Sequence, residues 1–387
     1  MIRQLERNDL PKLPVLHAAG ETLDANKHRR ARTVFEQLFP VVFFEHPWRH
    51  LKSRSLVSTD NDGTLNGMLG VQPRPMQFGN EAITAAVSAE LFVDPNSRTK
   101  MGGVQLLKEL LNGPHDLSIA DIANDSTRKI WTMLGGTILP TFGLYWMRLL
   151  RPSGFAASRL PNRTVRRVAN GVACLLDRTG QKLKPTMFEV PKARLTGRPL
   201  DTTTFLNHFE EFTKHNQLTP IYDQSAFDWF EKRMDFVFWF SGPSKMVAVE
   251  NARGQIQGWY IYQTDNRGIA RVAQVVATPR TIVGVLEHLY HQCYTEGCVA
   301  VLGRMQPDFQ QAFLDTGCLF RRRDRYVLVH SRRPDIMNAF HAGQAFLSHL
   351  EGESCLQVWN DPLRAAKHLK TCQSSKPSVT ETHVVSA

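Results

Sequence analysis

The sequence predicts an α/β protein of the α+β type, with two tandem domains that each hold a mixed, mostly antiparallel sheet flanked by helices. Its 387 residues are enough for two domains of ordinary size, each with its own core. One order of strands, turns and helices also occurs twice along the chain. Domains duplicated in this way are expected to pack together and share a cleft. The matching landmarks are Gly63 and Gly254, Pro95 and Pro279, and Gly135 and Gly317, which lie 191, 184 and 182 residues apart.

The first predicted domain covers residues 1–150. Helices are expected at Leu10–Ala19 and Ala31–Phe39, and Pro40 should end the second of them. Three strands should follow between Leu51 and Phe92, because β-branched and aromatic residues alternate there around turn-forming glycines. The turns are Asn61-Asp62-Gly63 and Gly79-Asn80.

The 18 residues from Ile130 to Met147 carry no charge, which is the length of a short membrane span. Glycines and a proline interrupt this run and would break a single helix repeatedly. We therefore predict the end of a helix, a strand, a turn and another strand. The interrupting residues are Gly135, Gly136, Pro140 and Gly143.

Residues 151–200 form a predicted linker that is strongly basic and contains one helix, Arg163–Asp177. An apolar stripe on that helix should dock it on a domain, and the alternative is peripheral contact with a membrane surface. The second domain should cover residues 201–350, and residues 351–387 a C-terminal extension with a disordered tail. The second-domain elements are expected at Lys245–Asn251, Gln255–Gln263, Ile269–Ala277, Thr281–Tyr294, Cys298–Arg304, Pro307–Asp315 and Tyr326–His330.

A basic, glycine-containing loop follows the third strand of the first domain. Arg98 and Lys100 precede Gly102 and Gly103, which stand at the start of a predicted helix. Backbone N–H groups at a helix N-terminus are unpaired, and the helix dipole favours negative charge. A plain tight turn is the alternative, but the pattern also suits a phosphate.

This loop resembles the acyl-CoA loop of the GNAT acetyltransferase superfamily, in which Arg or Gln is followed by two residues, Gly, any residue, and Gly or Ala. Arg98 and Gly103 match the ends of the pattern, while Met101 stands where the first glycine is usual. A second family pattern places Asn124, Trp131 and Gly135 in register on a strand and helix, with Asp125 or Ser126 as the helix cap. Trp131 replaces the usual tyrosine, and an indole N–H is too weak an acid to protonate a leaving thiolate.

The resemblance, which is to tandem-GNAT proteins including the Fem type, implies the roles of the site residues. Glu90 is the first candidate for the general base, and Asp121 is the alternate. The backbone from Leu91 through Phe92 to Val93 would pair with the pantetheine amides like an added strand. The remaining implied acyl-CoA contacts are Arg98, Lys100, Met101, Gly102, Gly103, Asn124 and Trp131.

The predicted function is transfer of an acyl group from acetyl-CoA, or another acyl-CoA, to a primary amine bound between the domains. One alternative is a Fem-like transferase that uses aminoacyl-tRNA, and another is a non-catalytic binding protein. Fem-type proteins generally lack a good pyrophosphate loop, so the loop disfavours nucleic acid as a partner. We expect a small-molecule or sugar amine as the acceptor, and the second domain, without such a loop, to supply acceptor recognition. The oligomeric state stays open.

Composition sets the remaining expectations. A net charge of +11 indicates acidic partners, such as CoA phosphates. The six cysteines are scattered singly with no CxxC pair, and the charged N-terminus lacks a cleavable signal, so we expect a reducing cytoplasm.

We expect no metal site, because His288 and Cys293 belong to an apolar helix. We interpret the basic run Arg321–Arg325 as a solvated face rather than a phosphate contact. Glu351 and Glu353 are interpreted as a polar turn, with contact to the acceptor ammonium as the alternative.

Overall fold

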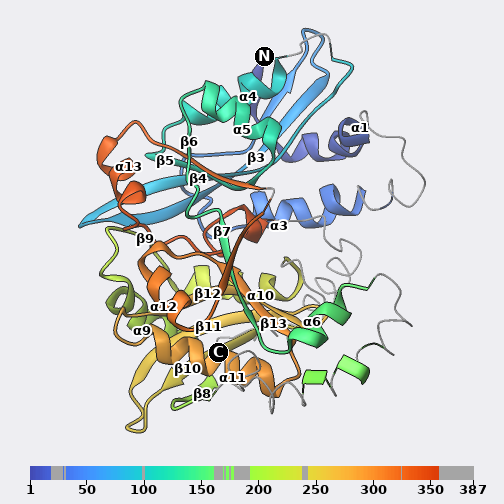
Figure 1. Ribbon diagram of the computed structural model, residues 1–387. Coiled ribbons are helices and arrows are strands. Elements are labelled where there is room, and N and C mark those ends of the chain that lie inside the picture. The colour runs from blue at the N-terminus through green and yellow to red at the C-terminus, as the bar shows by residue number, and fades with distance from the viewer. Residues whose placement is uncertain are drawn as a thin grey trace, which may run out of the picture.

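The computed structural model describes residues 1–18, 29, 32–97, 101–160, 169, 171–173, 176–177, 192–237, 243–323 and 325–356. Figure 1 shows two halves, each a sheet with helices packed against it. The elements of the first half are β1 (Ile2–Gln4), η1 (Arg7–Lys12), α1 (Leu13–Ala18), η2 (Val34–Leu38), α3 (Phe39–Phe43), β2 (Leu56–Thr59), β3 (Leu65–Phe78), β4 (Glu81–Val93), α4 (Gly102–Leu111), β5 (Leu117–Ala123), α5 (Asp125–Met133), β6 (Thr137–Ile138), β7 (Leu144–Leu149) and α6 (Pro152–Ser158). Those of the second half are β8 (Thr196–Pro199), α9 (Thr202–Thr213), β9 (Leu218–Pro220), α10 (Gln224–Val237), β10 (Lys245–Glu250), β11 (Ile256–Thr264), β12 (Ile269–Ala277), α11 (Ile282–Thr295), β13 (Ala300–Arg304), η3 (Pro307–Phe309), α12 (Gln310–Asp315), β14 (Leu319–Arg322), β15 (Tyr326–His330), α13 (Pro334–His341) and η4 (Glu353–Leu356).

The two sheets have matching strand orders, which agrees with the internal repeat in the sequence. The first sheet runs β1-β2-β3-β4-β5-β15-β6, with β9 added at β3, and the second runs β8-β10-β11-β12-β13-β7-β14. The turn glycines Gly63 and Gly254 both have a positive φ, at 81° and 73°. Glycine adopts that conformation without steric cost, so the same hairpin turn recurs in both halves.

The halves exchange one strand each. β7 belongs to the first half of the sequence but pairs with β13 and β14 in the second sheet. β15 belongs to the second half but pairs with β5 and β6 in the first sheet, with Leu328 opposite both Ala120 and Ile138. Each sheet is therefore completed by a strand from the other half of the chain, and the junction near residue 150 is not a simple boundary between two independent sheets.

A hydrophobic core joins the halves. The largest cluster of buried apolar side chains includes Phe39 from α3, Phe205 from α9 and Trp259 from β11, each at most 1% exposed. The rings of Phe205 and Trp259 lie 5.2 Å apart between centroids. Aromatic side chains of this size dominate the burial of apolar surface, so this cluster is a principal source of cohesion between the halves.

An ion pair lies inside the junction as well. Asp121 on β5 and Arg304 on β13 are in contact, and their side chains are almost fully buried. The same guanidinium donates to the Ser348 carbonyl oxygen at 3.3 Å. Burial alone would lower the pKa of Arg304, but the Asp121 carboxylate raises it above its ordinary value. The pair links equivalent ends of the two central strands.

Several local predictions are confirmed. The three strands β2, β3 and β4 and the strand β5 occur where expected. The uncharged run from Ile130 to Met147 divides into the end of α5, β6, a turn and most of β7. No helix among the described residues is long and apolar enough to cross a membrane.

Two local predictions are wrong. Pro40 does not end a helix, because the π-helix η2 runs directly into α3 and Pro40 lies in the first turn of α3. The cap of α5 is neither Asp125 nor Ser126 but Asn124, whose Oδ1 accepts from the Thr127 N–H at 2.9 Å.

Most of the predicted linker helix and of the tail lies outside the described residues. At the end of that helix, the buried Asp177 carboxylate accepts from the backbone N–H groups of Ser153 and Gly154 at the start of α6.

Candidate functional site

The site begins where two central strands of the first sheet separate. β4 and β5 are parallel and pair only from Ala85 with Leu117 to Val87 with Ile119. At the end of this ladder the Ser88 hydroxyl donates to the Ile119 carbonyl oxygen at 3.3 Å. Beyond it, β4 continues to pair with β3, while its edge toward β5 carries no further ladder. The backbone from residue 89 to 93 is therefore open on one side.

A β-bulge turns β4 at this point. Ala89 pairs with Gly70 and Phe92 with Met68, so Glu90 and Leu91 both face one residue of β3. Among the described residues Glu90 alone has a positive φ without being glycine, at 56°. A non-glycine residue in this conformation carries strain, and such residues concentrate at functional sites. The bulge directs the Glu90 side chain into the opening between the strands.

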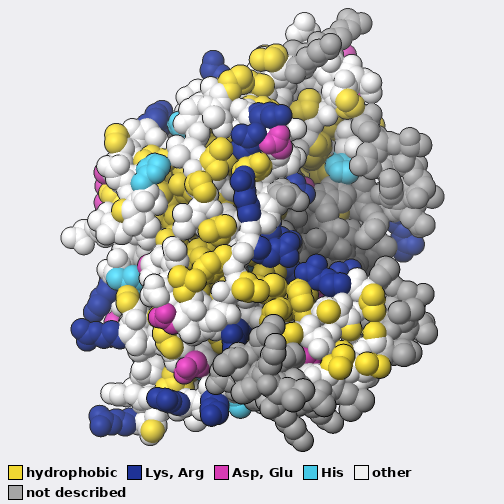
Figure 2. Space-filling model, viewed as in Figure 1, with side chains coloured by type: hydrophobic (Ala, Val, Ile, Leu, Met, Phe, Trp, Pro, Cys, Tyr) yellow, Lys and Arg dark blue, Asp and Glu magenta, His cyan; other side chains and the backbone are white. Residues whose placement is uncertain are grey.

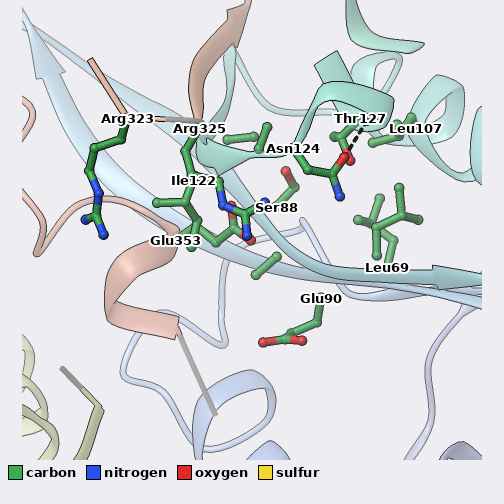
Figure 3. A pocket seen from close by; sticks show the side chains of 14 residues that line it. Leu69, Ser88, Glu90, Leu107, Ile122, Asn124, Thr127, Arg323, Arg325 and Glu353 are labelled. Carbon is green, nitrogen blue, oxygen red and sulfur yellow. Dashed lines mark hydrogen bonds between the residues drawn. The ribbon is translucent and has the colours of Figure 1, made fainter. Parts of the chain in front are cut away.

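The opening is a cleft of about 460 Å³. Residues from both halves line it, because the β14–β15 connection and η4 from the second half reach the end of β5. Figure 3 shows Leu107 and Thr127 on one side, Arg323 and Arg325 on the other, and Ser88, Glu90 and Glu353 between them. The lining residues are Leu69, Ser88, Ala89, Glu90, Leu91, Leu107, Ala120, Ile122, Ala123, Asn124, Thr127, Arg323, Arg325 and Glu353.

The glycine pair stands at the N-terminus of α4, as predicted. Gly102 is buried, and a Cβ added to it would lie 3.2 Å from Val93. Gly103 has more room, with the nearest atom of Val93 3.5 Å from such a Cβ. Met101 precedes the helix with its side chain 52% exposed and provides no side-chain cap. The predicted phosphate contacts Arg98 and Lys100 lie outside the described residues.

The side chains of the strand segment predicted to pair with pantetheine lie in different surroundings. Leu91 lines the cleft. Phe92 packs away from it, with its ring 5.4 Å from that of His17 and 5.6 Å from that of Phe35. Val93 packs under the start of α4. The arrangement leaves the backbone edge available for an extended ligand, whose amides would complete the hydrogen bonds that β5 does not supply.

The second sequence motif is only partly at the cleft. Asn124 and Thr127 line it at the start of α5. Trp131 does not, because its side chain is fully buried in a core cluster with Leu106 and Leu328. Its Nε1 has no hydrogen-bond partner in the described part of the chain. The expectation that Trp131 contacts the acyl-CoA is thus not supported by its position, since apolar packing holds the indole in the core.

The two candidate bases have different surroundings. Glu90 lies in the cleft, whereas Asp121 is not among the lining residues. The Asp121 carboxylate is in contact with Arg304 and also accepts from the Glu353 N–H and from the Ser354 hydroxyl, the latter at 3.3 Å. These contacts hold the carboxylate inside the junction, and it does not line the cleft. They argue for a structural role for Asp121 rather than for the role of alternate base.

Glu353 is a cleft residue that the sequence did not single out as catalytic. It opens η4, close to the ends of β4 and β5. Burial raises its pKa well above the ordinary value, the carboxylates of Asp121 and Glu90 raise it further, and Arg325 lowers it. The protonated form of this carboxyl is therefore favoured relative to that of an exposed glutamate. Glu351, in the same predicted polar turn, is 4% exposed and accepts from the Tyr222 hydroxyl, so this turn belongs to the interior.

Gly352 allows this arrangement, because a Cβ at this position would overlap the Asp121 carboxylate. We expect Gly352→Ala to cost about 1–3 kcal/mol of unfolding free energy, the usual cost of overpacking. Urea unfolding measures it. Gly254→Ala is unsuitable as a control because Gly254 has a positive φ. Gly171→Ala, at a helical position with nothing within 4 Å of the added Cβ, should not destabilise the protein. Equal stability of Gly352→Ala and the parent would contradict the packing.

No group of three or more potential metal ligands occurs among the residues that the structure describes. His288 instead forms a hydrogen bond with the Tyr260 hydroxyl at 2.9 Å. The functional groups at the cleft are carboxyl groups, guanidinium groups and the backbone of an open strand edge.

Comparisons with known proteins agree on the fold. No protein-family model matches the chain, and no curated protein matches it by sequence. Among solved structures, a conserved protein of unknown function from Enterococcus faecalis V583, described as a "probable N-acyltransferase", has a TM-score of 0.52 at 12% identity, covering 88% of this chain and 73% of its own. A GCN5-related N-acetyltransferase from Anabaena variabilis has a TM-score of 0.52 at 10% identity, covering 85% and 72%. The fold class is confirmed, as is the predicted resemblance: the chain has a GNAT fold.

Proposed function

We propose that the protein is an acyl-CoA-dependent N-acyltransferase, with acetyl-CoA as the first donor to test and a primary amine as the acceptor. The observation that carries this proposal is the divergence of β4 from β5 next to a glycine-containing helix start. An open strand edge suits the pantetheine amides, and the N-terminus of α4 suits a pyrophosphate. Two solved structures with this fold are described as N-acyltransferase or N-acetyltransferase, which supports the same reaction class.

Glu90 and Glu353 have complementary roles in this reaction. Glu90 takes one proton from the acceptor ammonium, and the neutral amine then forms a C–N bond with the thioester carbonyl carbon as the C–S bond breaks. The Glu353 carboxyl gives its proton to the leaving sulfur, a role that the buried Trp131 does not fill. The second proton of the nitrogen restores Glu353, and the proton on Glu90 passes to water. The products are an amide, CoA thiol and one proton.

The variant Gly103→Glu should lose binding of acetyl-CoA and keep the fold. Space at Gly103 accommodates a side chain, since the nearest atom to an added Cβ is 3.5 Å away. The new carboxylate would repel the pyrophosphate at the helix start. Acetyl-CoA at about a hundred times its dissociation constant should stabilise the parent by about 2.7 kcal/mol, a thermal shift of a few degrees. The shift should vanish in the variant.

Gln105→Glu is the matched control, because it adds the same charge to an exposed position of α4. It should retain most of the shift. CoA without the acetyl group should also stabilise the parent, since the proposed contacts are made by pantetheine and pyrophosphate. Retained tight binding in Gly103→Glu would refute the assignment of the helix start, and no shift with either ligand in the parent would refute the proposed donor.

A further inference from the structure

The exchanged strands bring a basic segment to the cleft. β14 ends at Arg322 in the second sheet, and β15 begins at Tyr326 in the first. The connection must cross from one sheet to the other within three residues. Because Tyr326 pairs with Ala123 at the end of β5, the crossing occurs beside the cleft. Arg323 and Arg325 line the cleft for this reason.

Both guanidinium groups have defined surroundings. The Arg323 guanidinium lies 5.0 Å from the centre of the Tyr145 ring on β7, a cation–π contact that fixes one of its faces. The side chain of Arg325 extends toward Glu353 in Figure 3 and lowers the pKa of that carboxyl. Figure 2 shows Lys and Arg gathering where the two halves meet on this face of the molecule.

Two guanidinium groups, those of Arg323 and Arg325, line this end of the cleft. Two further arginines nearby are each paired with a carboxylate, Arg304 with Asp121 and Arg271 with Asp265 at 3.1 Å. Burial lowers the pKa of His349 well below its ordinary value, and Arg304, Arg323 and Arg271 lower it further. The paired N–H donors of Arg323 and Arg325 would stabilise an anionic group here.

The position of these arginines separates them from the proposed pyrophosphate site. Leu107 of α4 and Arg323 lie on opposite sides of the cleft, with Glu90 and Glu353 between them. A donor that reaches the cleft from the α4 side would place its thioester near the two carboxyl groups. The arginines then lie beyond the reacting atoms, on the side where the acceptor must enter.

We infer that the acceptor is a primary amine that also carries a carboxylate or phosphate group, and that Arg323 and Arg325 bind this group while the amine faces Glu90. The inference rests on the proposed function and assigns the acceptor class to the same site. Guanidinium groups bind both anions through paired N–H donors. Arg323 and Arg325 are thus specificity residues, and they take no part in moving protons.

The test compares amines that differ only in the anionic group. The probes are 4-aminobutyrate against butylamine, and O-phosphoethanolamine against ethanolamine, each with acetyl-CoA and each also titrated calorimetrically without it. For the parent we expect higher kcat/KM and tighter binding with the anionic member of at least one pair. Arg325→Gln and Arg323→Gln should lower kcat/KM for that probe by about ten- to a hundred-fold, and should change kcat/KM for the neutral amine much less. Arg325→Lys should recover part of the loss.

Arg321→Gln is the matched control, because Arg321 is exposed on β14 and does not line the cleft. It should behave like the parent. Equal use of neutral and anionic amines by the parent would overturn the inference, and so would an equal loss for both members of a pair in Arg325→Gln. Loss of the acetyl-CoA thermal shift in Arg325→Gln would assign the arginines to the donor instead. If no amine is acetylated, the proposed function fails. In that case, binding of the anionic probe that depends on the arginines would still support the anion site. Absence of such binding would overturn the anion site.

Discussion

Asp121→Asn should lower the free energy of unfolding by about 3–5 kcal/mol, because it leaves the Arg304 guanidinium buried without its counter-charge. The two side chains are almost fully buried, so water cannot replace the lost partner. The amide also lacks the charge that attracts the Glu353 N–H and the Ser354 hydroxyl. Urea unfolding of the parent and the variant measures the difference.

Two comparisons separate the ion pair from general damage. Asp125→Asn removes an exposed carboxylate that pairs with Arg128 at 2.7 Å, and it should have little effect on stability. The double variant Asp121→Leu with Arg304→Met removes both charges, and it should be more stable than Asp121→Asn alone. A loss in Asp121→Asn no larger than that in Asp125→Asn would show that the junction does not depend on this pair.

The parts of the fold that the sequence predicted are those set by local pattern. Alternating apolar residues and turn glycines located β2, β3 and β4, and an apolar run located β5. Asn124 was identified through a family pattern, and its role as a helix cap became clear only from its hydrogen bond to Thr127. Pro40 misled the prediction because proline is compatible with the first turn of a helix as well as with its end.

The parts that could not be predicted depend on contacts between distant segments. No local pattern shows that β7 and β15 change sheets, and it is this exchange that brings Arg323 and Arg325 to the cleft. A basic run before a strand looks like a solvated face when its neighbours are unknown. The role of Glu353 as an acid was not predicted for the same reason, since the groups that raise its pKa include Asp121 and Glu90, more than 200 residues earlier. Trp131 matched a family register, but apolar packing decides its orientation.

Glu90→Gln should reduce kcat for acetyl transfer by about 10²–10⁴-fold, the usual contribution of a positioned general base. The amide keeps the shape of the side chain at the bulge but cannot accept the proton of the acceptor ammonium. Acetyl-CoA binding should be unchanged, because the proposed donor contacts involve the backbone of β4 and the start of α4. Glu210→Gln, an exposed position on α9, is the control and should leave kcat unaffected.

The pH dependence distinguishes Glu90 from Glu353. Because the pKa of Glu353 is raised, its carboxyl is protonated below that value and ionised above it, so it should produce the alkaline decline of kcat. The unfolded chain releases this proton at a lower pH than the folded protein does. Parent stability should therefore fall as pH rises from the ordinary carboxyl pKa to this raised pKa, and Glu353→Gln should lack that fall. We expect Glu353→Gln to lower kcat and to remove the alkaline decline, whereas the residual activity of Glu90→Gln should retain that decline. An alkaline decline retained in Glu353→Gln would mean that another group protonates the leaving sulfur, and Glu353 would then only shape the cleft beside Glu90.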